Sequence, residues 1–464
     1  MSSDWPEVSL ESLKAGTKSA FAMGPFGSKI KAENFVKAGV PVIKGGNLGG
    51  TYLSETSFDF LTQEKASELA SSKAGRLDIV VTHRGTLGQV GLIPESSKYE
   101  QYVVSQSQLK MSFDTEKVDP YYVYYFLRSP LGQSRLLANT SQVGVPAIAQ
   151  ALTTIRQLQI PLPPRDSQTE ITATLRALDD RISLLRETNA TLEAIAQALF
   201  KSWFVDFDPV RAKMEGRTPE GMDEATAALF PDGFETSELG EVPRGWQATD
   251  LAELTSKSGG SIQTGPFGSQ LHASDYVEVG IPVVMPKDIS LRRVQTESIA
   301  RVSPIDADRL ARHQLAPGDV VFSRRGDVEK HALISETERG WLCGTGCLLV
   351  RPGPKWPSPN FLSLLLDLPQ SRLWLVRHAV GATMPNLNTG ILGSVPVVMP
   401  SREVVTAFEE IVSGLEARRA HNAEQAQTLS TLRDTLLPRL ISGQLRLPDA
   451  QAATEAALDG APQA

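Results

Sequence analysis

Between residues 171 and 199 the apolar side chains return in alternating steps of four and three, which predicts one long helix with a coiled-coil seam. Asn189 takes the one seam position that is not apolar. A helix with a single apolar stripe is not stable alone, so the pattern also indicates a partner helix. The apolar seam positions are Ile171, Leu175, Leu178, Ile182, Leu185, Leu192, Ala196 and Leu199.

A second segment repeats this rhythm less strictly. Asn422 stands at the point of the register that Asn189 occupies in the first segment. Pro438 predicts the end of this helix, because proline lacks the N–H group that would continue the hydrogen-bond ladder. The seam positions are Phe408, Ile411, Leu415, Arg418, Asn422, Gln425, Leu429, Leu432 and Leu436.

The segments that precede the two helices are copies of one another. The repeated sequences are GPFGS at 24–28 and 265–269 and QSRL at 133–136 and 370–373. Between GPFGS and QSRL, single residues of the first copy also recur in the second copy at nearly the same spacing. The chain is therefore a tandem duplication of a unit of about 230 residues, too long for a solenoid repeat and long enough to bury its own core.

Within each copy, strand-like runs such as VPVI (40–43) and DVVFS (319–323) alternate with Gly/Pro turns and short helices. The tyrosine-rich segment 119–129 is expected to be core rather than a stacking surface. The fold class is α+β: two similar mixed α/β domains joined by two long antiparallel helices that form a coiled coil, with a pseudo-twofold relation. We expect domains at 1–164 and 244–400, helices at 165–209 and 401–447, an irregular linker at 210–243 and a disordered tail at 448–464.

The antiparallel pairing follows from the duplication, because each helix comes after an equivalent domain. Asn189 and Asn422 would then meet near the middle of the pair, where buried asparagines fix the register at some cost in stability. The alternative is that each helix packs on its own domain as ordinary core.

Composition places the chain among globular proteins, with 41% apolar and 21% charged residues. No apolar run approaches the length of a membrane helix, and the N-terminus has no export signal. The two cysteines, Cys343 and Cys347, suit a reduced, cytoplasmic protein. The net charge of −7 is uneven: residues 1–160 and 244–400 each carry a net charge of +2, and the rest carries −11. The charge of the duplicated parts thus permits nucleic-acid binding, whereas the acidic connecting segments are poorly suited to contact phosphates.

Catalytic motifs are absent from the sequence. There is no P-loop, no dinucleotide-binding glycine motif, no zinc-ligand spacing and no nuclease or amino-methyltransferase motif. Asp206 and Asp208 resemble a metal-binding pair, but at a helix end they are better explained by capping. No metal or cofactor is expected in this chain, and the sequence predicts a binding protein rather than an enzyme.

Each copy carries a basic tip directly after a predicted strand, THRGTLG at 82–88 and SRRGDVE at 323–329. A guanidinium at such a position can bind a phosphate or the O6/N7 edge of guanine. The alternative is a local ion pair of Arg84 with Asp78 and of Arg325 with Asp319. The GPFGS turns are expected to bury their phenylalanine and to serve as scaffold or as a phosphate contact.

The segment ALFKSWFVDFDPV (198–210), which ends the first long helix, carries a group of aromatic residues that are expected to be exposed.

Taken together, these features resemble the specificity subunit of type I restriction–modification systems, and the resemblance covers nearly the whole chain. The markers are the duplicated GPFGS…GVPVIKG and GPFGS…GIPVVMP, the strand endings HRG and RRG, and IPLPPRDSQTEI, LFKSWFVDFDP, PRGWQATDL and LLPRLISGQL.

The resemblance implies two target-recognition domains that read the two halves of a bipartite double-stranded DNA sequence, held apart by the central helices. It also implies assembly with two methyltransferase subunits and with restriction subunits, which would hold S-adenosylmethionine, ATP and Mg²⁺. Trp203, Phe204 and Phe207 are the candidate contacts with these partners. No membrane is involved.

Residues that differ between the copies are the candidates for reading different half-sites, whereas shared residues should hold the fold or touch the backbone. The alternative function is a non-catalytic bivalent protein-interaction scaffold that has lost DNA binding. The DNA-binding candidates are Lys29, Lys31, His83, Arg84, Gln89, Gln270, His272, Arg324, Arg325 and Lys330.

Overall fold

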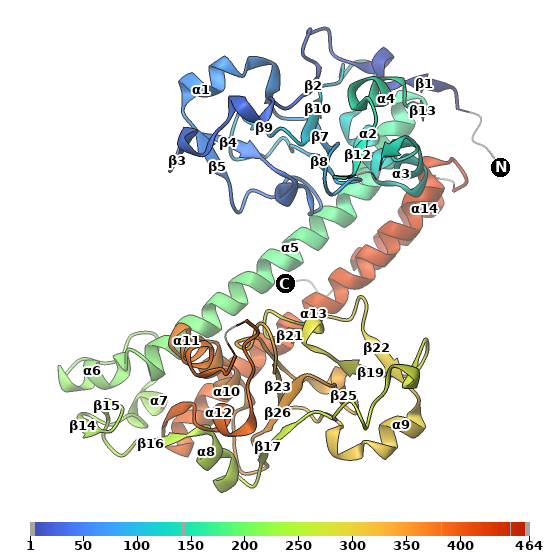
Figure 1. Ribbon diagram of the computed structural model, residues 1–464. Helices are drawn as coiled ribbons and strands as arrows, with labels where there is room; N and C mark the ends of the chain where they lie inside the picture. Colours follow the sequence, from blue (N-terminus) through green and yellow to red (C-terminus); the bar gives the residue numbers. More distant parts are fainter. Residues whose placement is uncertain (1–4, 142–143, 382, 446, 460–464) are drawn as a thin grey trace. The chain divides into compact units, whose positions relative to one another are not determined.

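The computed structural model describes residues 5–141, 144–381, 383–445 and 447–459. The chain forms two compact units. Unit 1 consists of Met1–Thr188 with His421–Ala464, and unit 2 of Asn189–Ala420. Each unit is a mixture of helices and small sheets, and each contains one half of each long helix (Figure 1).

Unit 1 contains two main sheets. A four-stranded sheet has the order β2-β10-β7-β8, and a five-stranded sheet has the order β3-β5-β4-β9-β6, in which only β4 and β9 are parallel. The strands are β2 (Phe21–Met23), β3 (Phe35–Val36), β4 (Val40–Ile43), β5 (Asp59–Leu61), β6 (Lys73–Ala74), β7 (Ile79–Thr82), β8 (Val90–Leu92), β9 (Tyr102–Val104) and β10 (Gln108–Met111).

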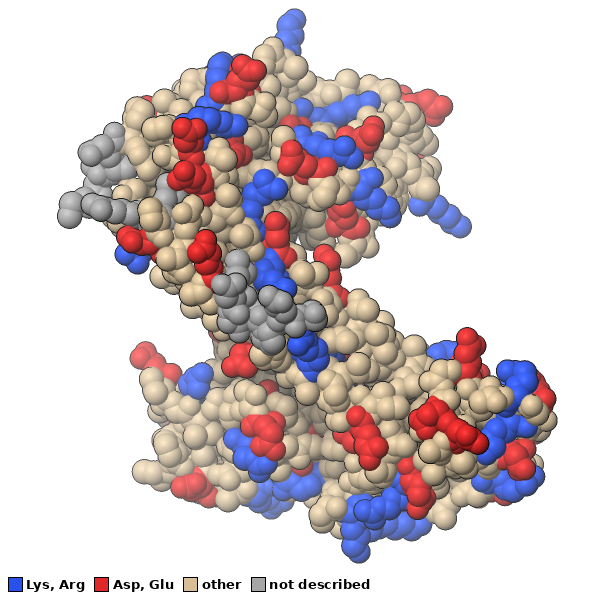
Figure 2. All heavy atoms as spheres, turned by 180° about the vertical axis from the view of Figure 1, so that it is seen from behind, with Lys and Arg blue, Asp and Glu red and all other residues tan. Residues whose placement is uncertain are grey.

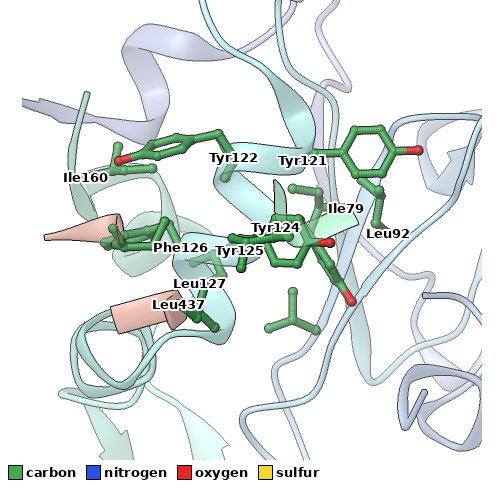
Figure 3. Packing of buried hydrophobic residues seen from close by; sticks show 14 of the residues in the cluster. Ile79, Leu92, Tyr121, Tyr122, Tyr124, Tyr125, Phe126, Leu127, Ile160 and Leu437 are labelled. Atoms are coloured by element: carbon green, nitrogen blue, oxygen red, sulfur yellow. The ribbon is translucent and has the colours of Figure 1, made fainter. Parts of the chain in front are cut away.

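Helix α2 (Pro120–Arg128) forms the centre of the unit 1 core. Its side chains from Tyr121 to Leu127 are all buried in one hydrophobic cluster. Figure 3 shows Tyr121 and Tyr124 near Ile79 and Leu92 of the four-stranded sheet, and Leu127 near Leu437 of the second long helix. Asp119 caps the helix by accepting a hydrogen bond of 2.9 Å from the backbone N–H of Tyr121. The prediction that this tyrosine-rich segment is core is confirmed.

Unit 2 repeats the same arrangement, as expected of a duplication. Its first sheet has the order β17-β26-β23-β24 and its second the order β18-β22-β19-β25, in which β19 and β25 are the parallel pair. The strands are β17 (Ser261–Thr264), β18 (Tyr276–Val277), β19 (Ile281–Val284), β22 (Ala300–Val302), β23 (Val320–Ser323), β24 (His331–Leu333), β25 (Leu342–Cys343) and β26 (Cys347–Arg351). Helix α10 (Pro359–Asp367) takes the place of α2.

The long helices α5 (Arg165–Phe204) and α13 (Arg402–Ile441) run antiparallel. In unit 1 the first half of α5 shares a hydrophobic cluster with the second half of α13, and in unit 2 the second half of α5 shares one with the first half of α13. The same clusters include α2 in unit 1 and α10 in unit 2, so each helix both pairs with its partner and packs on a domain.

Part of the predicted seam of α13 is wrong. Ile411 is 45% exposed, and Val412 is buried in its place. The reason is that this half of α13 packs on the domain core of unit 2 as well as on α5, which displaces the apolar stripe from a strict heptad. The helix continues through Pro438, which was expected to end it, and stops at Ile441, within the predicted bounds of 401–447.

Two segments predicted to lack regular structure are ordered. The expected linker contains α6 (Asp208–Met214), α7 (Glu224–Ala228) and a hairpin of β14 (Phe234–Ser237) and β15 (Gly240–Pro243). It is anchored by Phe230, which is buried against Trp203 with ring centroids 5.1 Å apart. Of the tail expected at 448–464, the part up to Asp459 belongs to α14 (Leu447–Asp459), whose Ala450 is buried in the unit 1 cluster, and residues 460–464 lie outside the described residues. These apolar anchors are too sparse to stand out in the sequence.

Candidate nucleic-acid interface

The two basic tips and the two GPFGS turns lie at equivalent sheet edges. In unit 1, β2 and β7 both pair antiparallel with β10, so they run parallel to each other and end at the same edge. The first GPFGS turn follows β2, and Arg84 follows β7. In unit 2, β17 and β23 flank β26 in the same way, which brings the second turn and Arg325 to one edge.

Each basic tip is held in place by a second segment of backbone. The N–H of Gly85 donates to the carbonyl oxygen of Pro146 at 2.8 Å, and the N–H of Gly326 donates to that of Pro385 at 3.1 Å. The preceding arginines are exposed, and no hydrogen bond or ion pair of their side chains is found in the described part of the chain. A fixed backbone thus presents a free guanidinium to solvent in each unit.

The alternative of local ion pairs for these arginines is wrong. Asp78 lies 3.9 Å from Lys110, and Asp319 forms an ion pair of 2.6 Å with Arg351. The aspartates precede the strands that the arginines follow, so the two groups lie at opposite strand ends. Burial raises the pKa of Asp78, which the neighbouring Lys110 partly offsets.

Of the ten candidate DNA contacts, those nearest the turns are accessible. Lys29, Lys31 and His272 are exposed; Lys31 has Glu33 as a loose partner at 3.7 Å. Gln270 is half-buried, and its side-chain oxygen accepts a hydrogen bond of 3.1 Å from the backbone N–H of Phe267. This hydrogen bond adds to the one that both turns share, from the backbone N–H of Lys29 or Gln270 to the carbonyl oxygen of the phenylalanine at 2.8 Å.

The four candidates beside the basic tips are more restricted. His83 is buried, and its Nε2 lies 3.1 Å from the carbonyl oxygen of Gln106; burial lowers its pKa. His83 also borders the hollow that Lys29 and Arg84 line, and its role as a DNA contact stays a prediction. The Nε of Arg324 donates to the carbonyl oxygen of Leu387 at 3.2 Å, Gln89 accepts from Thr82, and Lys330 pairs with Asp327 at 2.5 Å.

The GPFGS turns differ from the prediction in one decisive respect. Phe26 is 79% exposed and Phe267 is 58% exposed, whereas both were expected to be buried. The reason lies in the first glycine of each turn, which packs so closely on the backbone just after a neighbouring strand that the rest of the turn projects outward. A Cβ on Gly24 would lie 1.8 Å from the carbonyl oxygen of Ser105, and one on Gly265 would lie 2.0 Å from that of Gly344.

In unit 1 this edge encloses a hollow of about 640 Å³. Phe26, Lys29, Arg84 and Val145 all line it. Glu68 also borders the hollow, but its carboxylate is paired with Lys65 at 2.7 Å. The turn, the basic tip and the segment that holds the tip therefore form one continuous surface.

The sequence reasoning missed Val145 and Met384. They precede the prolines that clasp the basic tips, are 54% and 61% exposed, and differ between the copies. A signal was present, because both follow the repeated Val-Gly pair and come directly before a proline. A short apolar side chain at such a place can contact a thymine methyl group.

The asparagines proposed to set the register occupy buried or half-buried positions on the long helices. The Nδ2 of Asn189 donates to the carbonyl oxygen of Arg419 at 3.0 Å within unit 2, and Asn422 is 1% exposed. Asn189 thus contacts α13 from α5, as a register-setting residue must. A direct pairing of Asn189 with Asn422 stays a prediction.

The aromatic group at the end of α5 is not an exposed surface. Trp203 and Phe204 are 4% and 8% exposed, and both lie in the unit 2 core, where each contacts Phe408. Phe207 is partly buried against Phe234 and Trp246. The expectation of exposure is wrong because the segment after the helix folds back and covers these rings. Trp203 and Phe204 are thus covered by their own chain, and the role of the partly buried Phe207 as a partner contact stays a prediction.

Charges are interspersed over the molecule. On the face shown in Figure 2, Lys and Arg side chains alternate with Asp and Glu, and in neither unit does one sign dominate that face. Among the described residues no helix is long and apolar enough to cross a membrane, and no cluster of metal-ligating side chains occurs. Both cysteines are free and buried.

Comparison with known proteins agrees with the resemblance seen in the sequence. Residues 27–194 match the family described as the type I restriction modification DNA specificity domain. The type I restriction enzyme HindI specificity subunit of Haemophilus influenzae is 28% identical over 75% of this chain and 82% of its own length. The MjaIX specificity subunit of Methanocaldococcus jannaschii is 20% identical over 84% of this chain and 82% of its own.

A solved structure supports the fold. The S subunit of the type I restriction-modification system from M. genitalium superposes with a TM-score of 0.54 at 17% identity, over 94% of this chain and 96% of that one. Two domains joined by a pair of long helices are thus the architecture of both proteins.

Proposed function

We propose that this chain, whose sequence and fold are those of a non-catalytic type I restriction–modification specificity subunit, reads a bipartite DNA target with one sheet edge in each unit. The observation that carries the proposal is the equivalence of the two edges. Each presents an exposed, unpaired arginine, Arg84 or Arg325, on a backbone clasped by a proline segment. Arginine in such a fixed position suits a phosphate or a guanine edge.

The positions that differ between the copies are proposed to read the bases. Exposed side chains of different chemistry stand at corresponding places near each edge, and only such positions can distinguish two different half-sites. The pairs are Lys29 and Gln270, Lys31 and His272, and Val145 and Met384.

The chemistry is proposed to reside in partner subunits. Two methyltransferase subunits and the restriction subunits would bind S-adenosylmethionine, ATP and Mg²⁺, and the assembly would act in the cytoplasm. The chain itself would supply the DNA contacts and the helix pair that separates them.

The test is a map of methylated adenines. The chain is co-expressed with the methyltransferase subunit encoded beside it, in a host without adenine methylation, and the genome is sequenced with single-molecule detection. The expected result is one split motif with a fixed central gap. Co-purifying subunits that leave the genome unmethylated would instead favour a protein-interaction scaffold, for which salt would have little influence on DNA association.

Exchange of one set of side chains tests which residues read the bases. A chain carrying Lys29→Gln, Lys31→His and Val145→Met should alter one half-site of the methylated motif and leave the other intact. The matched control is the reciprocal exchange Gln270→Lys, His272→Lys and Met384→Val, which should alter only the other half-site. An unchanged motif in both variants would contradict this assignment.

A further inference from the structure

The phenylalanines of the two GPFGS turns are the most exposed aromatic side chains in the described residues, and nothing in the fold of either unit uses them. Phe26 is 79% exposed and Phe267 is 58% exposed. Exposing a ring of this size forgoes the free energy that its burial would supply. A duplicated chain that keeps such a ring in both copies is consistent with a ligand that covers it.

We infer that Phe26 and Phe267 are a matched pair of sequence-independent DNA contacts that pack on the deoxyribose rings of the target strand. This inference rests on the proposed function and adds to it the part of the DNA that each ring touches. The occupant is duplex DNA, and the contact is apolar.

Both phenylalanine rings lie close to a basic tip. Each ring lies at the same sheet edge as an exposed arginine, because the strand before the turn and the strand before the arginine are parallel neighbours of one central strand. In unit 1 Phe26 lines the same hollow as Lys29 and Arg84. An apolar ring close to a cation suits the DNA backbone, where an apolar sugar lies next to a phosphate.

The GPFGS sequence is identical in the two units. The side chains expected to read bases differ between the units, whereas the turn is the same in both. A contact that serves two different half-sites cannot depend on the base. Wedging a ring between base pairs would also depend on sequence, because the cost of unstacking differs among base steps. The deoxyribose is the one apolar surface that every nucleotide offers.

Contacts with neighbouring backbone and hydrogen bonds within the turn order each GPFGS segment. The first glycine of each turn is fixed by close packing on a neighbouring backbone, and in unit 2 the Gln270 side chain accepts a hydrogen bond from the backbone N–H of Phe267. The N–H of Lys29 donates to the carbonyl oxygen of Phe26 at 2.8 Å in unit 1. The rings are therefore presented on ordered turns, so little conformational freedom is lost on binding.

The experiment measures DNA binding by the complete complex with its methyltransferase subunits. Phe26→Ala and Phe267→Ala should each weaken binding about ten-fold, as expected for losing the burial of one aromatic ring. The loss should be equal on cognate and non-cognate DNA, and the slope of log K against log salt should stay that of the wild type, since no phosphate contact is removed. Phe26→Leu, which keeps an apolar side chain, should retain most of the affinity.

Three outcomes would overturn the inference. Unchanged affinity in both alanine variants would show that the rings do not touch DNA. A loss confined to cognate DNA, with a relaxed half-site, would mean that they read bases. A loss of co-purification with the methyltransferase subunit would mean that they bind protein. A wild-type complex that binds no DNA would instead defeat the proposed function itself. Melting temperatures should match the wild type, because the rings are exposed.

Discussion

Asp179 and Arg433 form a buried ion pair of 2.6 Å between α5 and α13 in unit 1. Asp179 is 1% exposed, and its second oxygen accepts a hydrogen bond of 2.8 Å from the hydroxyl of Tyr125. One carboxylate thus connects both long helices to the central helix of the domain. Burial and the neighbouring Asp179 raise the pKa of the Tyr125 hydroxyl, which keeps it a hydrogen-bond donor.

Removing the carboxylate should destabilise unit 1 strongly. Asp179→Asn keeps a group that can accept from Tyr125 but leaves Arg433 with only the exposed Asp434, 2.7 Å away, as its counter-ion, at an expected cost of up to about 3 kcal/mol in the free energy of unfolding. Urea unfolding of the full chain measures it. The double variant Asp179→Leu with Arg433→Met should recover most of the loss; equal instability of the single and double variants would contradict this account.

The two glycines of a GPFGS turn should respond differently to the same substitution. Gly265→Ala places a methyl group 2.0 Å from the carbonyl oxygen of Gly344 and should cost about 1–3 kcal/mol, because backbone must move. Gly268→Ala is the matched control: its Cβ meets nothing within 4 Å, so stability should be nearly unchanged. Thermal unfolding of both variants checks this, and equal melting temperatures would exclude the close approach.

His331 makes the stability of unit 2 depend on pH. Complete burial and the nearby charge of Arg292 lower the pKa of this histidine to about 3, while its Nε2 lies 3.0 Å from the carbonyl oxygen of Ser363. The unfolded chain binds a proton near pH 6.5 and the folded chain does not. The contribution of His331 to the free energy of unfolding is thus fully present above pH 6.5. It falls as the pH drops toward 3, by up to about 1.4 kcal/mol per pH unit.

The measurement compares the wild type with His331→Gln, which keeps an amide donor and cannot be protonated. Urea unfolding at pH 6.5, 5.5 and 4.5 should give a steeper loss of stability in the wild type than in the variant. Other titrating groups contribute equally to both proteins, so their effect cancels in the difference. Parallel pH profiles would mean that His331 is protonated in the folded protein.

The basic tips should contribute electrostatically to DNA binding. Arg84→Ala and Arg325→Ala should each weaken binding of the complex to DNA, and a purely phosphate-binding arginine should also reduce the salt slope by about one. An arginine that binds guanine should instead relax one position of the methylated motif. Arg312→Ala, which removes an exposed arginine from outside these tips, is the control for general loss of charge. Wild-type binding by both tip variants would contradict the proposed edges.

The sequence by itself determined the duplication, the two long helices and the buried tyrosines of α2. All three depend on patterns local to the chain: repeated words, a heptad rhythm, and aromatic residues on every face of a short helix. The resemblance to type I specificity subunits and the absence of catalytic motifs also needed no structure. Even the basic tips were found in this way, because a strand followed by Arg-Gly is a local pattern.

Only the tertiary structure decided which of those side chains are accessible. Phe26 projects because Gly24 packs on the backbone at Ser105, and Trp203 is covered because a later segment folds back on it. His83 and Arg84 are neighbours in sequence, yet the side chain of His83 is buried and that of Arg84 is exposed. Exposure is set by contacts between segments far apart in the chain, and no local period encodes them.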